Sequence, residues 1–105
     1  MNLSMRFTII LLTVILIVPC AFADREAEFS FAQKLFNDGY YDLAAAQYRQ
    51  FTETYPDDPR VPLAHFMRGK ALAESEFWGN AREAFLRVAL EHSDSKFAPE
   101  ALYMA

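Results

Sequence analysis

The sequence predicts an all-α fold of antiparallel helical hairpins, and two observations support that prediction. Positions of similar character recur at an interval of 37 residues along most of the chain. Within each copy, apolar residues are spaced three and four apart, as on one face of an α-helix. The recurring pairs include Tyr40 and Phe77, Ala44 and Ala81, Tyr48 and Phe85, Pro62 and Pro99, and Phe66 and Tyr103. A period of this length is typical of arrays in which one helical unit stacks on the next.

The N-terminal residues 1–23 have the pattern of a secretory signal peptide. Arg6 is their only charged residue, residues 8–18 are uncharged and apolar, and Ala21-Phe22-Ala23 fits a small-x-small cleavage site. The apolar run is shorter than the roughly 20 residues that cross a bilayer. We therefore predict cleavage after Ala23. The alternative is a lipoprotein acylated at Cys20, although Pro19 fits poorly before such a cysteine, and only in that case do we expect membrane association.

The expected mature chain, residues 24–105, contains no cysteine, which excludes disulfides and thiolate chemistry from it. Its nine basic and 14 acidic residues leave a net charge of −5, with both signs interspersed. Such a chain lacks the basic patch that binds nucleic acid. Export without disulfides is compatible with a bacterial periplasm.

The first repeat, residues 24–58, is expected to hold two helices, A and B. Helix A covers residues 24–38, with Ala27, Phe31 and Leu35 at helical spacing, and Gly39 ends it in the left-handed conformation. Helix B covers residues 41–55 and ends before Pro56. Its apolar stripe consists of Ala44, Tyr48, Phe51 and Tyr55.

The second repeat, residues 59–95, follows the same plan. Its helix A begins between Pro59 and Pro62, because proline is tolerated in a first turn, and runs to about Ser75. Helix B covers residues 78–91. Its expected buried residues are Ala81, Phe85, Val88 and Ala89. Residues 96–105 begin a third repeat with one more helix.

The repeated residues resemble the tetratricopeptide repeat (TPR) over residues 24–105. The family pattern matches small residues at Ala32 and Gly69, apolar residues at Leu35 and Leu72, alanine at Ala44 and Ala81, aromatic residues at Tyr48 and Phe85, and proline at Pro56. The resemblance implies a short right-handed solenoid of about two repeats plus one helix.

The match departs from the family in several places. The period is 37 rather than the usual 34. Glu76 stands where the first repeat has Gly39, Arg68 where it has Phe31, and Ser93 where it has Pro56. The stretch Tyr-Pro-Asp-Asp-Pro at residues 55–59 resembles a bacterial envelope subgroup with longer loops. That subgroup includes the periplasmic Tol-Pal coordinating protein and outer-membrane assembly lipoproteins.

The residues form no catalytic constellation, so we expect neither an enzyme nor a cofactor. His65 and His92 belong to different helices and lack the spacing of metal ligands. Asp57 and Asp58 could suggest a metal site, but aspartate in such a turn usually bonds its own backbone. Ser93 and Ser95 are interpreted as turn or capping residues for the same reason.

The expected function is protein binding. In TPR proteins helix A lines the concave face, which implies a binding surface at Glu26, Phe29, Gln33, Phe36, Asn37, Leu63, Phe66, Lys70, Ala73, Glu74, Glu100 and Tyr103. Phe29, Phe66 and Tyr103 recur once per repeat, which permits two interpretations. The favoured interpretation is that they pack helix A against helix A; the alternative is that their outer edges form an apolar strip for an extended or helical partner segment. Trp78 likewise covers the turn between helices A and B, the favoured interpretation, or anchors a partner.

These observations together predict a non-catalytic scaffold of the bacterial cell envelope. An array usually needs about three repeats, and nothing follows residues 96–105 to cover their apolar side chains. We therefore expect a weakly stable monomer, a homo-oligomer, or the first repeats of a longer array. The alternatives are a lipid-anchored component of an outer-membrane assembly complex and the accessory domain of a larger protein.

Overall fold

The computed structural model describes residues 24–105, and all regular structure in that range is helical. The first helix covers residues 24–37. It is followed by α2 (Tyr41–Thr54), α3 (Val61–Glu74), α4 (Trp78–Glu91) and α5 (Ala98–Met104). These bounds nearly coincide with the predicted ones. The predicted signal peptide and Cys20 lie outside the described residues.

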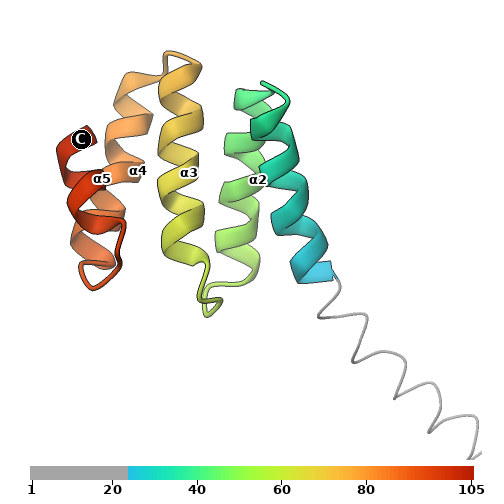
Figure 1. Cartoon of the computed structure of the whole chain (residues 1–105), viewed down its shortest axis with the longest axis horizontal. Helices are drawn as coiled ribbons and strands as arrows, with labels where there is room; N and C mark the ends of the chain where they lie inside the picture. The colour runs from blue at the N-terminus through green and yellow to red at the C-terminus, as the bar shows by residue number, and fades with distance from the viewer. Residues whose placement is uncertain (1–23) are drawn as a thin grey trace, which may run out of the picture.

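The helices stand side by side in chain order and alternate in direction (Figure 1). α2 contacts α3, α3 contacts α4, and α4 contacts α5. The first helix and α2 form the first hairpin, and α3 and α4 form the second. The chain is thus a short helical-repeat solenoid, as predicted, in which each helix from α2 onward packs against the next one along the chain.

The two hairpin turns have the same geometry. The Tyr40 N–H donates to the Leu35 carbonyl at 2.9 Å, and the Phe77 N–H donates to the Leu72 carbonyl at 2.9 Å. Gly39 has a φ of +87°, as its predicted role requires, and Glu76 takes its place with a φ of +65°. The left-handed region suits glycine but costs a residue with a Cβ about 1–2 kcal/mol. The second turn is therefore a strained copy of the first.

Small residues let the helices of each hairpin approach closely, as predicted. Ala32 is fully buried in the first hairpin. A Cβ added to Gly69 would lie 2.7–2.9 Å from ring carbons of Phe85, too close for ordinary contact. Tyr48 holds the position of Phe85 in the first hairpin and is fully buried. Its hydroxyl has no hydrogen-bond partner among residues 24–105, and burial raises the pKa of Tyr48 to about 12.

The predicted apolar stripe of the first helix is wrong at two positions. Phe31 is 52% exposed, and Ala27 is exposed as well. The counterpart of Phe31 is Arg68 of α3, which is half-buried. Burial is the main cause that lowers the pKa of Arg68, and the positive charge of Arg49 on α2 lowers it further. This face of α3 therefore lies toward α2. No helix precedes the first one within residues 24–105, so the same face stays open there. In α4, Ala89 is half-buried rather than buried.

Candidate protein-binding surface

The loop between the two hairpins is closed by a cluster of charged groups. Arg60 donates from Nε and Nη2 to the two carboxylate oxygens of Asp58 at 2.9 and 3.1 Å. Its Nη1 donates to Glu26 of the first helix at 2.6 Å. The Asp58 side chain is almost fully buried, and the hydrogen bond from the Arg60 guanidinium lowers the pKa of Asp58 to about 2. The backbone N–H of Arg60 also donates to Asp58, which confirms the predicted turn role.

The same charged cluster also holds Phe29, one of the predicted binding residues, in place. Arg60 lies 4.9 Å from the centroid of the Phe29 ring and covers it. In the second loop Ser95 and Phe97 hold the places of Asp58 and Arg60. The Ser95 hydroxyl accepts from the Phe97 N–H at 3.2 Å, so its predicted turn role is confirmed. Phe97 then stacks on Phe66 at 5.4 Å between ring centroids.

Phe29 and Phe66 belong to the core, and the hypothesis that their edges form an apolar strip is wrong. Each is 4% exposed. The Phe29 ring lies 5.2 Å from that of Phe51, and the Phe66 ring lies 5.7 Å from that of Phe85. Both side chains point between the two helices of their own hairpin. Tyr103, the third member of the series, is 90% exposed because no helix follows α5 in the described structure.

The other predicted residues divide into accessible and partly covered side chains. The accessible ones are Glu26, Gln33, Asn37, Glu74, Glu100 and Tyr103, and the half-buried ones are Phe36, Leu63, Lys70 and Ala73. Phe36 packs against the Tyr41 ring at 5.2 Å between centroids. Lys70 lies over the Phe66 ring, with Nζ 5.7 Å from the centroid. The helix-A face thus carries polar side chains at 37-residue intervals: Gln33 and Asn37 are exposed, and of their counterparts Glu74 is exposed and Lys70 is half-buried.

The two histidines, which the sequence assigns to different helices, are stacked. Their ring centroids lie 5.6 Å apart with planes 26° apart, joining α3 to the residue that caps α4. His65 is buried, and its Nδ1 has no hydrogen-bond partner in the described part of the chain. Burial lowers the pKa of His65 to about 4, and the positive charges of Arg87, His92 and Arg68 act in the same direction. The imidazole is therefore neutral at physiological pH. No group of three or more potential metal ligands occurs within residues 24–105.

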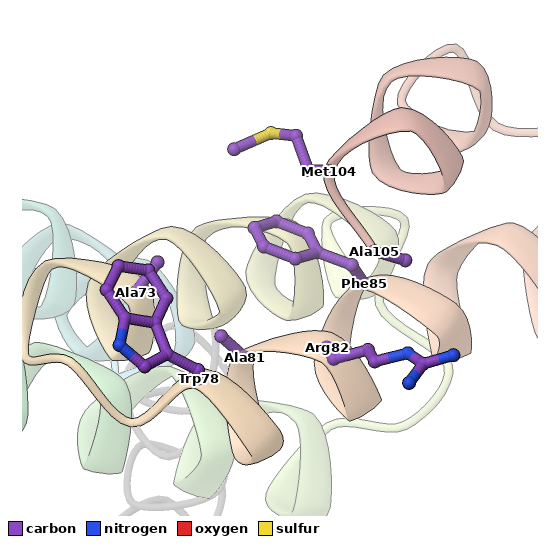
Figure 2. Close-up of a pocket in the computed structure, with 7 residues that line it drawn as sticks. All are labelled: Ala73, Trp78, Ala81, Arg82, Phe85, Met104 and Ala105. Carbon is purple, nitrogen blue, oxygen red and sulfur yellow. The ribbon is translucent and has the colours of Figure 1, made fainter.

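A groove that the sequence did not indicate opens between α3, α4 and the end of α5. It has a volume of about 400 Å³ and is lined by Ala73, Trp78, Ala81, Arg82, Phe85, Met104 and Ala105. In Figure 2 the Phe85 ring lies between Met104 on one side and Trp78 on the other. Trp78 is 65% exposed, so the favoured interpretation, in which it is buried over the hairpin turn, is wrong.

Comparisons with known proteins leave the family open. No protein-family model matches the chain, and no curated protein or solved structure shows significant similarity to it. Across residues 24–105, no helix combines the length and apolar character needed to cross a membrane.

Proposed function

We propose that this chain is a non-catalytic, TPR-like scaffold of the bacterial cell envelope that binds a segment of a partner protein along its helix-A face. The observation that carries the proposal is the repetition of polar side chains on that face, all of them exposed except the half-buried Lys70. Gln33 and Asn37 of the first helix recur as Lys70 and Glu74 of α3. A surface that repeats at a fixed interval over a packed core suits an elongated peptide ligand.

The partly covered apolar residues of the face support the same function. Leu63 and Phe36 pack against the core with part of each side chain accessible. Gln33, Lys70 and Glu74 lie on the same two helices and would supply the polar rim of the interface. An apolar centre within a polar rim is the usual composition of a protein–protein contact. The envelope location rests on the predicted signal peptide and on the resemblance to envelope TPR proteins.

Site-specific photo-crosslinking in a Gram-negative host tests this proposal. A benzophenone amino acid replaces Gln33 or Lys70 on the helix-A face, and Gln50 of α2 or Glu83 of α4 as controls on exposed positions of the B helices. We expect one discrete adduct from both helix-A positions and none from the controls. Circular dichroism of each variant verifies the helical fold. Adducts from the B-helix positions alone, or from none of the four, would contradict the proposed surface.

A further inference from the structure

Three arginines from consecutive helices lie close enough to act on one another around α3. α3 packs against both α2 and α4. Burial is the largest cause that lowers the pKa of its Arg68, and the positive charges of Arg49 on α2 and Arg87 on α4 lower it further. The carboxylates of Glu83 and Glu53 oppose these two charges with smaller effects. Cations therefore dominate the surroundings of Arg68, and Arg49, Arg68 and Arg87 are called the arginine cluster below.

Arg68 is the member of the arginine cluster that lacks a carboxylate partner. Arg49 pairs with Glu53 of its own helix at 2.9 Å, and Arg87 pairs with Glu91 of its own helix at 3.8 Å. Arg68 is half-buried and forms no salt bridge with any residue of the range 24–105. A half-buried cation beside two like charges is unfavourable unless an anion compensates it.

The repeat shows that the fold does not require a cation at this position. The counterpart of Arg68 in the first helix is the apolar Phe31. An apolar side chain on this face of α3 would pack toward α2 without the cost of removing a guanidinium from water. Anion binding therefore accounts for the arginine where packing does not.

A second polar group without a partner lies one turn before Arg68. His65 and Arg68 are three residues apart in α3, so they share one face of the helix. His65 is buried, and its Nδ1 has no hydrogen-bond partner in the described part of the chain. Arg87 and Arg68 are among the charges that act on His65, which places the imidazole beside the arginine cluster. In the tautomer with its proton on Nδ1, this ring would donate to an anion held by Arg68.

The arginine cluster lies between the two hairpins and does not depend on the residues near Ala105. Its floor is α3, with α2 and α4 beside it. Arg87 is the member closest to the end of the sequence, and its counterpart on α2 is Gln50. Gln50 stays exposed although the second hairpin follows it. A further repeat packed in the same way would leave Arg87 accessible as well.

We propose that the arginine cluster binds an oxyanion, a phosphate or carboxylate group, with Arg68 as the central ligand. The planar guanidinium of Arg68 offers two parallel N–H donors to two oxygens of the anion. The exposed Arg49 and Arg87 add positive potential on either side, which favours the approach of the anion. None of these residues belongs to the proposed helix-A surface, so the two proposals can fail independently.

Nuclear magnetic resonance of the arginine side chains tests this site, because the Nε–Hε signals report on each guanidinium separately. Inorganic phosphate is added at neutral pH, and acetate is added in a parallel series. Sodium chloride keeps the ionic strength constant, since salt screens exposed charges. Arg82 of α4 is the internal control, because it is exposed and forms no salt bridge with residues 24–105. We expect a saturable shift at Arg68 and none at Arg82.

Three variants separate binding from folding. Arg68→Met places an apolar side chain where the first helix has Phe31, so the fold should be kept, which circular dichroism verifies. It should abolish the saturable shifts that remain observable at Arg49 and Arg87. Arg68→Lys keeps the charge but loses the two-donor fork and should weaken the affinity about tenfold. Arg82→Met removes the same charge elsewhere and should leave the affinity unchanged.

The two anion series distinguish the source of the ligand. Saturation with phosphate but not with acetate would identify a phosphate group, and saturation with acetate would identify a carboxylate. Shifts that grow linearly with both anions, or that are equal at Arg68 and Arg82, would overturn the proposal. Unchanged affinity in a folded Arg68→Met variant would overturn it as well.

Discussion

Replacement of Tyr48 by phenylalanine should stabilise this protein, although most substitutions in a core do the opposite. The Tyr48 hydroxyl is buried without a hydrogen-bond partner among the described residues, and the matching residue of the second hairpin is already phenylalanine. A buried, unpaired hydroxyl costs roughly 1–3 kcal/mol, so Tyr48→Phe should raise the free energy of unfolding by about 1–2 kcal/mol. For a domain of this size, each 1 kcal/mol of added stability raises the Tm by roughly 4–8 °C.

Urea unfolding followed by far-UV circular dichroism measures this effect, with an unchanged m-value as the sign that the unfolded state is the same. The reverse change, Phe85→Tyr, places an unpaired hydroxyl in the second hairpin and should cost a similar amount. Lower stability of Tyr48→Phe would refute the reasoning, because it would mean that the hydroxyl has a partner in solution.

The same residue predicts a dependence on alkaline pH. Burial raises the pKa of Tyr48 from 10.0 to about 12. The unfolded chain therefore loses its phenolic proton at a lower pH than the folded chain. The contribution of Tyr48 to the free energy of unfolding should be fully present below pH 10. It should be lost between pH 10 and 12, by about 3 kcal/mol in all. Tyr48→Phe should remove this component, and an alkaline profile identical to that of the unsubstituted chain would contradict it.

Four further changes can be measured by the same unfolding assay. Glu76→Gly should raise the free energy of unfolding by about 1 kcal/mol, because glycine adopts the left-handed conformation of this position without strain. A loss of stability would mean that the Glu76 side chain contributes more than the strain costs. Gly69→Val should lower stability by about 2 kcal/mol through its clash with Phe85, and a neutral result would show that the ring can move aside. His65 should make stability fall by about 3 kcal/mol as the pH drops from 6.5 to 4, because the unfolded imidazole takes up a proton that the buried one does not, and His65→Gln should flatten that part of the profile. Asp58→Asn should cost about 3 kcal/mol and remove the loss of stability expected as the pH falls from 4 towards 2; equal stability of Asp58→Asn and the unsubstituted chain at neutral pH would exclude a structural role for the ion pair.

Matched controls exist for two of these changes. Gly79 lies in α4, and a Cβ added there would meet nothing within 4 Å. Gly79→Ala should therefore stabilise by up to about 1 kcal/mol through helix propensity alone, in contrast to a substitution at Gly69. Gly39→Ala should lower stability by about 1 kcal/mol, since it creates in the first turn the strain that Glu76 already carries in the second.

Local signals made the helices predictable. Gly39 ends the first helix, Pro56 follows the second, and Pro62 and Pro99 lie in first turns, where proline is tolerated. These constraints act within a few residues of the chain, so the pattern alone located them. The small residue at Gly69 was also predictable, because the repeat aligns it with Ala32.

Side-chain direction across helices was less predictable. The spacing placed Phe29 and Phe66 on helix A without showing that they point between the helices rather than into the concave face. The stacking of His65 on His92 brings together residues that are far apart in the sequence, and the helical spacing of either one does not reveal it. The exposure of Trp78 depends on which helix lies beside it, and no local pattern contains that information.

Two contacts, here called joints, link the units of the array. They depend on different interactions, and this gives them different sensitivities to acid. The joint between the first and second hairpins is closed by Asp58, Arg60 and Glu26, whereas the joint to α5 is closed by Phe97 stacked on Phe66. Because each unit touches only its neighbours, one joint can loosen while the other stays closed. Protonation of Asp58 weakens only the charged joint. Acid should therefore act on the array in two steps: protonation of His65 between pH 6.5 and 4 weakens the second hairpin, and loss of the Asp58 charge between pH 4 and 2 weakens the joint between the hairpins.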